Sequence, residues 1–205
     1  MQFESANPSV VKSIKQRVFL NAWLRARRGP RPLPVFGDFQ PDDMADELAD
    51  MMGYDVEGCG DGARFWITQE GSRLAATYGN DDPDQRTNRY LDDAIGPDRF
   101  EWVAPCYRTL LTRKRPTYSI SMVQDADGKD VSFERLLLPF GSADHVEQIV
   151  GSFKAISIDG GFRINNLMGA RPKAIPVRVV NAVIDRDFVP SQPSHRSSND
   201  VVELG

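Results

Sequence analysis

The chain has 205 residues, of which 40% are hydrophobic and 26% are charged. This length fits one domain of ordinary size with extensions, and this composition excludes a chain that is disordered throughout, because enough apolar surface is available for a core. The formal net charge is −4. It argues against general nucleic-acid binding, since that affinity comes mainly from clustered Lys and Arg side chains.

The termini and cysteines carry few signals of targeting or metal binding. The first eight residues are polar and lack the charged and apolar regions of a signal peptide. No segment approaches the about 20 apolar residues that span a bilayer, so we expect a cytoplasmic protein without a transmembrane segment. Cys59 and Cys106 are the only cysteines, and neither belongs to a Cys-x-x-Cys or Cys/His cluster. We therefore predict no metal site.

Residues 10–28 are rich in helix formers and are predicted to form the first helix, which Gly29 and Pro30 end. The residues expected to form its apolar face are Val11, Ile14, Val18 and Ala22. Placed outside the sheet, such a helix is predicted to mediate dimerisation. The candidate interface residues are Val11, Ile14, Val18 and Trp23.

Charge is divided sharply in the first third of the chain. Residues 5–37 contain cations and no acid, whereas residues 38–61 contain acids and no cation. One interpretation is a basic helix that binds a membrane surface or a partner. The interpretation that we favour is a helix whose Lys and Arg stems cover its own apolar face. Two prolines in residues 31–37 predict an extended connector after this helix.

Residues 42–52 are predicted to form a second helix, with acids in its first turn where the helix dipole favours them. Short strands are expected at 53–56 and 63–68, joined by a glycine-rich turn. The glycine spacing there does not match a dinucleotide-binding fingerprint. A short helix at 71–78 and a polar loop at 79–88 follow.

Residues 97–113 are predicted to form a longer helix, with Pro105 expected to kink or split it. The apolar residues that predict this helix are Phe100, Val103, Tyr107, Leu110 and Leu111. Strands are expected after it, and their ranges are 117–123, 131–140 and 146–158. Asp127-Gly128 is a hairpin signal between the first two. One further strand is expected within 173–185, and 191–199 has the composition of a disordered segment.

The most specific motif of the chain is Glu134-Arg135-Leu136-Leu137-Leu138-Pro139. Other characteristic pieces are Trp23-Leu24-Arg25, Arg28-Gly29, Asp38-Phe39 with Pro41-Asp42, Asp55-Val56, Arg64-Phe65, Gly71-Ser72 and Arg115-Pro116-Thr117-Tyr118. With these pieces, residues 19–153 resemble a family of stand-alone PAS-domain proteins found mainly in alphaproteobacteria. The order of two strands, several short helices and three strands is also the layout of a PAS domain.

The resemblance implies an α+β fold, namely a PAS-like five-stranded antiparallel sheet with short flanking helices. The N-terminal amphipathic helix and connector would occupy residues 1–37, the PAS-like core residues 38–158, and a partly disordered C-terminal extension residues 159–205. The sequence departs from the family at Gln69 and Glu70, which lengthen a link near the rim of a PAS pocket. Ligand identity is therefore not carried over.

Catalytic and cofactor signals are weak, so we expect a protein that is not an enzyme. The two histidines are His145 and His195, and no nucleophile, base and metal-ligand set converges around them. Some PAS domains bind haem through one histidine, but His145 lies beside a predicted turn and is interpreted as an exposed residue. Neither cysteine lies in the stretch typical of flavin photosensors, and the cofactor stays unknown.

A pocket between the sheet and the short helices is the expected binding site. Phe65 and Ile67 share one face of a predicted strand, and the resemblance assigns that face inward. Tyr107, Tyr118 and Arg135 are candidate polar groups around the pocket. The alternative is a filled core with Arg135 paired to a surface acid.

The absence of a recognisable output domain predicts that the signal passes through dimer or partner contacts. We interpret the chain as a PAS-type signalling module that senses a small molecule, with a homodimer and another signalling protein as partners. The alternative is a ligand-free adaptor that docks other signalling proteins.

Overall fold

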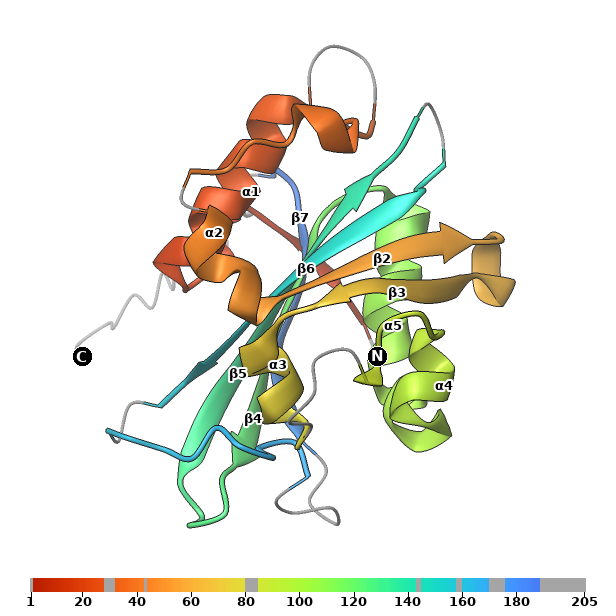
Figure 1. Cartoon of the computed structure of the whole chain (residues 1–205). Coiled ribbons are helices and arrows are strands. Elements are labelled where there is room, and N and C mark those ends of the chain that lie inside the picture. Colours follow the sequence, from red (N-terminus) through yellow and green to blue (C-terminus); the bar gives the residue numbers. More distant parts are fainter. Residues whose placement is uncertain are drawn as a thin grey trace, which may run out of the picture.

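The computed structural model describes residues 2–27, 32–42, 44–79, 85–142, 145–157, 160–169 and 176–188. In these parts of the chain, seven strands form one sheet in the order β1-β7-β4-β5-β6-β2-β3. Helices lie on both faces of the sheet (Figure 1). The predicted α+β class is therefore confirmed.

The strands are β1 (Glu4–Ala6), β2 (Met51–Glu57), β3 (Arg64–Glu70), β4 (Thr117–Gln124), β5 (Asp130–Phe140), β6 (Gln148–Ile156) and β7 (Val177–Ile184). The α-helices are α1 (Ile14–Ala26), α2 (Met44–Glu47), α3 (Ser72–Thr77), α4 (Leu91–Ile95) and α5 (Pro97–Arg113). Four short 3-10 turns are η1 (Pro8–Val10), η2 (Phe36–Asp38), η3 (Leu48–Asp50) and η4 (Gly60–Gly62).

The sheet is wider than the five strands that were predicted. The five expected strands correspond to β2 to β6, which pair antiparallel. The strand expected within 173–185 is β7, and it pairs antiparallel with β4. The unpredicted β1 then pairs parallel with β7. These additions cover the backbone edge of β4, which would otherwise present unpaired N–H and C=O groups.

The second helix is much shorter than predicted. One turn, α2, is followed by η3, and Met51 and Met52 begin β2 instead of ending a helix. Both methionines pair with β6, opposite Ser152 and Gly151, and both are buried. Pairing with a strand a hundred residues away therefore overrides the local helix propensity of this segment.

The first helix also differs from the prediction, because it begins at Ile14 with Ser13 as its N-cap. Val11 precedes the helix, and Ile14 is 73% exposed, so the predicted apolar face is wrong. The side chains that α1 buries are Gln16, Phe19, Leu20, Ala22, Trp23 and Ala26. This face packs on the chain's own sheet.

Helix α5 has the predicted bounds, and Pro105 lies inside it without splitting it. Lys114, with a φ of 51°, adopts the left-handed conformation that ends the helix. The expected loop at 79–88 and the end of the strand expected at 146–158 lie partly outside the described residues, and the segment 191–199, predicted to be disordered, lies wholly outside them.

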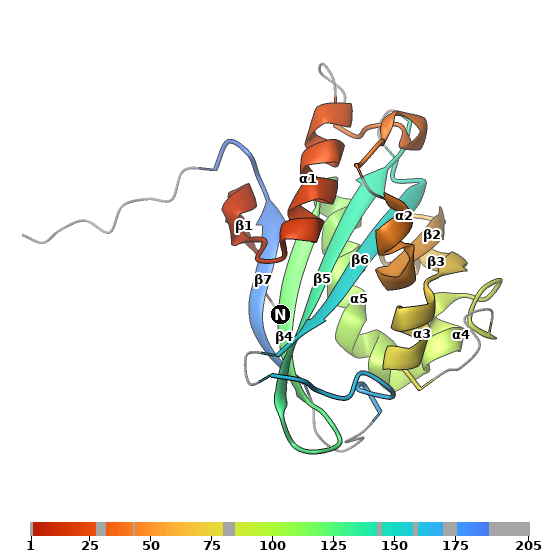
Figure 2. The same ribbon diagram turned by 60° about the vertical axis from the view of Figure 1, so that its left-hand side comes forward.

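The sheet has a hydrophobic core on each side. Figure 2 shows helix α1 on one side of the sheet and α5 on the other. We call the side covered by α3, α4 and α5 the helix face, and the side covered by α1 and residues 32–39 the N-terminal face. Because side chains alternate along each strand, neighbouring residues of β5 belong to different cores. Within the described residues, no helix is both long enough and apolar enough to cross a membrane.

Candidate functional site

The motif at 134–139 forms most of the second half of β5, and its side chains serve both faces of the sheet. Leu136 and Leu138 belong to the core of the N-terminal face, whereas Leu137 belongs to the core of the helix face. By the same alternation, Glu134 points to the N-terminal face and Arg135 to the helix face. The two charged side chains are adjacent in sequence but lie on opposite sides of the sheet.

On the N-terminal face, the motif holds the start and middle of the first helix. One oxygen of Glu134, Oε2, accepts hydrogen bonds from the Tyr118 hydroxyl at 2.8 Å and from the Ser13 N–H at 3.2 Å. The Lys12 N–H donates to the Tyr118 hydroxyl at 3.1 Å. The Trp23 indole N–H donates to the Pro139 carbonyl at 2.6 Å. The buried carboxylate of Glu134 is therefore stabilised by two hydrogen-bond donors of the protein, the Tyr118 hydroxyl and the Ser13 N–H.

Tyr118 was predicted to line the pocket, and this prediction is wrong. It is opposite Leu136 in the β4–β5 register and packs in the core of the N-terminal face. Burial raises the pKa of its phenol, and the bond with Glu134 adds to the rise while the Lys12 N–H opposes it. Successive side chains of a strand point to opposite faces of the sheet, so an error of one residue in assigning the inward positions of β4 puts Tyr118 on the wrong face.

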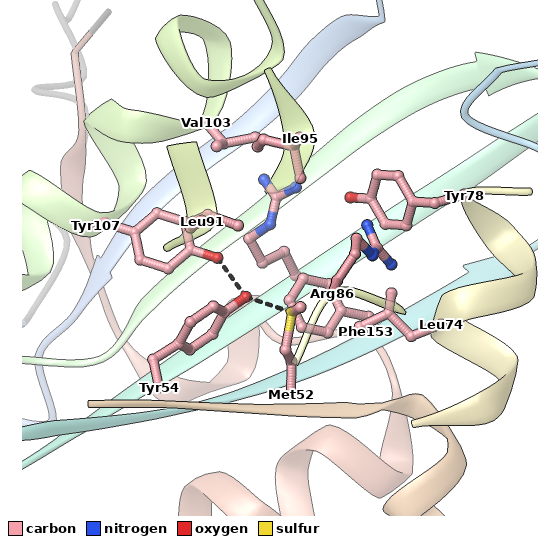
Figure 3. A pocket seen from close by; sticks show the side chains of 11 residues that line it. Met52, Tyr54, Leu74, Tyr78, Arg86, Leu91, Ile95, Val103, Tyr107 and Phe153 are labelled. Carbon is pink, nitrogen blue, oxygen red and sulfur yellow. Dashed lines mark hydrogen bonds between the residues drawn. The ribbon is translucent and has the colours of Figure 1, made fainter. Parts of the chain in front are cut away.

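On the helix face, side chains from β2, α3, α4, α5, β5 and β6 surround a small pocket (Figure 3). The lining residues are Met52, Tyr54, Leu74, Tyr78, Arg86, Leu91, Ile95, Val103, Tyr107, Arg135 and Phe153. The cavity volume is about 20 Å³. This is close to the space that one water molecule needs, so most of the pocket is filled by side chains.

Two tyrosines form a short hydrogen-bonded chain at the pocket wall. The Tyr54 and Tyr107 hydroxyls are 2.7 Å apart, and the Tyr54 hydroxyl donates to the Met52 sulfur at 2.8 Å (Figure 3). Burial raises the pKa of both Tyr54 and Tyr107. Both phenols therefore stay neutral at physiological pH and can act as donors.

The first guanidinium of the pocket, that of Arg86, has an acidic partner. Arg86 Nε donates to Glu70 Oε2 at 2.9 Å, and Arg86 Nη2 pairs with the other carboxylate oxygen. Both residues are buried, and the guanidinium stacks 4.3 Å from the centre of the Tyr78 ring. Burial lowers the pKa of Arg86 to about 10, so this guanidinium is still a cation at neutral pH.

The second guanidinium, that of Arg135, is 3% exposed and has no acidic partner among the described residues. Its Nε is buried and makes no hydrogen bond. The Nη1 group faces the Cys106 sulfur at 3.9 Å, which is a weak acceptor at a long distance. The rings of Trp102, Phe133 and Phe153 lie 5.6 to 5.9 Å away. The alternative prediction, an ion pair between Arg135 and a surface acid, is not found among the described residues.

A third guanidinium lies close by on the same face. Arg178, from β7, donates to the Cys106 sulfur at 3.1 Å and to the Trp102 carbonyl at 3.1 Å. It also stacks 4.2 Å from the Trp102 ring. Burial lowers the pKa of Arg178, and the nearby Arg135 lowers it further. Two cations therefore converge on one buried sulfur.

The structure brings together only part of the predicted pocket. Tyr107 and Arg135 line it, whereas Phe65 and Ile67 share their face but lie in the surrounding core. The ring of Phe65 packs 4.8 Å from that of Tyr107. The pocket residues that the sequence analysis missed include Tyr54, Tyr78 and Arg86. Alternation from a strand starting at Met51 could have found Tyr54, but no local signal marks the other two.

The predicted interface residues lie in three different environments. Val11 and Trp23 are each 1% exposed and belong to the core of the N-terminal face. Val18 is half-buried. Ile14 is 73% exposed and is the one member of the set that is fully open to a partner.

A larger crevice without charged side chains in its described lining opens beside β2. Its volume is about 160 Å³, and it lies between β2, β6 and residues 36–48. Phe36, Met44, Leu48 and Val150 are among its apolar walls, and none of the described residues that line it is charged. Thr68, Gln69 and Gln148 supply its polar groups, but unlike the pocket on the helix face it has no cation in its described lining.

The pocket on the helix face combines a buried cation with neutral hydroxyl donors in a mostly apolar wall. Such groups can hold an anion or a polar ligand by hydrogen bonds. Within the described residues, no three His, Cys, Asp or Glu side chains are placed to hold a metal ion. The chemistry available in this pocket is recognition through donated hydrogen bonds and charge.

Comparisons with known proteins give little further information. No family model matches the sequence, and no curated protein matches it. One solved structure with a partial likeness is VqmA bound to DPO, at 7% identity and a TM-score of 0.35, over 53% of each chain. Another is the Vibrio cholerae VqmA dimer in the absence of target DNA, at 8% identity and a TM-score of 0.35, over 58% of this chain and 54% of that one. The chain thus spans about half the length of these structures. A likeness this low does not establish a shared fold.

Proposed function

We propose that the chain is a cytoplasmic, non-enzymatic signalling module of the PAS type, related to the stand-alone PAS proteins of alphaproteobacteria. The pocket on the helix face binds a small molecule, and the first helix passes the signal to a second copy or to another protein. The antiparallel run of β2 to β6, with short helices between β3 and β4, supports the PAS-like layout. The observation that carries the proposal is Arg135, a buried cation at the pocket that has no acidic partner among the described residues.

Strand β5 supplies a physical link between the pocket and the first helix. Arg135 faces the pocket, and the preceding residue, Glu134, holds the N–H of Ser13 at the start of α1. A ligand can change the output only if it interacts differently with two states of the protein. A ligand that draws Arg135 toward itself would act on the backbone that positions Glu134, and so on the start of α1.

The proposal predicts that a cytoplasmic metabolite raises the melting temperature of the purified protein in a dose-dependent way. A screen of a broad metabolite set by thermal shift measures this directly. A hit should lose its effect in Tyr107→Phe, which removes a hydroxyl at the pocket, and keep it in Tyr118→Phe, which removes one on the opposite face. A screen without any dose-dependent shift would contradict ligand sensing.

A second candidate function is a ligand-free adaptor. The observation that favours it is the small cavity volume of about 20 Å³, together with the exposed apolar side chains of Ile14, Val177 and Val179. In this case co-purification from the native host should return a stable partner. Deleting the first helix is a poor test, because Phe19 and Trp23 belong to the core. Ile14→Glu is better: it should weaken the association, and unchanged binding would argue against α1 as the docking element.

A further inference from the structure

We propose that the pocket on the helix face recognises the carboxylate group of a small organic acid, and that Arg135 is the residue that binds it. This inference rests on the proposed ligand-binding function and specifies the class of ligand. It is carried by the charge balance, the hydrogen-bond donors and the size of the pocket.

The charge balance favours an anion. Arg86 and Glu70 form a buried ion pair, and their charges cancel. Tyr54 and Tyr107 are neutral, because burial raises the pKa of each phenol. The pKa of Arg135 lies above its usual value even though burial opposes this, so this side chain remains a cation. The described walls of the pocket therefore carry one positive charge in excess, and a buried charge is costly unless it is paired.

The donors at the pocket match the needs of a carboxylate. The Arg135 Nε–H is buried and donates to nothing in the described structure. The proton of Tyr54 is given to the sulfur of Met52, which is a weak acceptor and easily replaced. If Tyr54 donates to Tyr107 instead, the Tyr107 proton becomes available to a ligand, since the two hydroxyls are 2.7 Å apart. An ionised oxygen is the strongest acceptor for such groups.

The size and lining of the pocket favour a small organic acid over a phosphate. A cavity of about 20 Å³ admits a group of about the size of one water molecule, such as one oxygen of a carboxylate. A phosphate is larger and carries up to about two negative charges, more than Arg135 balances. Leu74, Leu91, Ile95 and Val103 line the same pocket and would contact the apolar remainder of an acid, which this volume restricts to a very short chain (Figure 3).

The test follows the arginine side chains by NMR, using the full chain labelled with ¹⁵N. The buried Nε–H of Arg135 is assigned from the signal that disappears in Arg135→Met. Sodium formate is the probe, sodium chloride at equal ionic strength is the control for other anions, and formamide is the neutral analogue of formate. We expect a saturable shift of the Arg135 signal with formate. The Arg86 Nε–H is an internal control, because Glu70 already occupies it.

Two matched variants separate binding from folding. Tyr107→Phe keeps the ring and removes one donor at the pocket, and it should weaken formate binding by about fivefold to tenfold. Tyr118→Phe makes the same change on the opposite face and should leave formate binding unchanged. In Arg135→Met, the backbone amide of Tyr107 serves as reporter and should show no saturable response to formate.

The outcomes are distinguishable. If formamide binds as well as formate, or chloride gives the same saturable shift, the carboxylate inference is wrong while the pocket remains a binding site. If Arg135→Met still binds formate at unchanged affinity, Arg135 is not the recognition residue. If neither formate nor formamide nor any compound of the metabolite screen has an effect, the proposed ligand-binding function fails as well. A formate response that requires Arg135 and Tyr107 supports both proposals.

Discussion

On the N-terminal face of the sheet, Glu134 receives two hydrogen bonds from the protein, whereas on the helix face its neighbour Arg135 has a buried Nε without a hydrogen-bond partner in the described part of the chain. Three buried oxygens of the described residues also make no hydrogen bond: Gln16 Oε1 and Ser152 Oγ are neutral, and Glu47 Oε2 forms an ion pair with Lys154 at 2.5 Å. A charge without a partner costs far more than a neutral group. The charge of Glu134 thus has partners within the N-terminal face, whereas on the helix face the Arg135 Nε–H remains available to the proposed anion.

The largest loss of stability is expected from a substitution in the core of the N-terminal face. Trp23→Ala removes a fully buried indole and its bond to the Pro139 carbonyl, so we expect it to lower the free energy of unfolding by about 5 kcal/mol. Ile14→Ala, on the same helix, should change it by less than about 0.5 kcal/mol, because Ile14 is 73% exposed. Equilibrium unfolding in urea measures both. Equal effects would mean that α1 does not pack on the sheet as described.

The two pocket guanidiniums give the next contrast. Arg86→Met leaves Glu70 buried without its partner and should lower the free energy of unfolding by about 3–5 kcal/mol. Arg135→Met removes a cation that has no acidic partner among the described residues, so it should leave that free energy within about 1 kcal/mol of the wild type or raise it. Unfolding in the absence of organic acids compares them. A large loss in Arg135→Met would mark Arg135 as structural.

A smaller effect is expected at Glu134. Glu134→Leu leaves the Tyr118 hydroxyl and the Ser13 N–H without their acceptor, which should cost about 1–3 kcal/mol. Tyr118→Phe in the same background removes one of these stranded donors and should recover part of the loss. A double-mutant cycle by chemical unfolding measures the coupling. Additive effects would show that the bond between these side chains contributes nothing.

The smallest effect concerns another buried carboxylate, that of Asp125 in the β4–β5 turn. Its carboxylate accepts backbone N–H bonds from Asp127, Lys129 and Arg163. Although burial opposes it, these bonds lower the pKa of Asp125. A lowered folded-state pKa adds stability above the unfolded pKa of about 4, and this stability is lost as the pH falls through the folded-state pKa. Asp125→Asn should therefore unfold with a weaker dependence on acid pH, and identical pH profiles would refute the assignment.

Much of the fold followed from local patterns. Helix α5 and the strands β3 to β6 lie close to their predicted ranges, because apolar periodicity and turn residues act over a few residues. The errors lie where distant contacts decide. Met51 and Met52 are strand residues because β6 pairs with them, and β1 forms because it pairs with β7.

The candidate site was predictable only in part. Tyr107 and Arg135 were identified, since both lie in strongly patterned elements. Tyr118 was placed on the wrong face because the alternation of side chains along a strand defines two faces but does not say which of them lines the pocket. Tyr78 and Arg86 line the pocket but lie outside the regular helices and strands, where the sequence has no periodic pattern from which to predict the direction of a side chain.

The most direct test of the central claim is a high-resolution crystal structure of protein purified without refolding and soaked in sodium formate. We expect density for a planar anion within about 3 Å of the Arg135 guanidinium, with the Tyr107 hydroxyl turned toward it. A pocket closed over Arg135, with its guanidinium paired to a carboxylate of the same chain, would contradict the account.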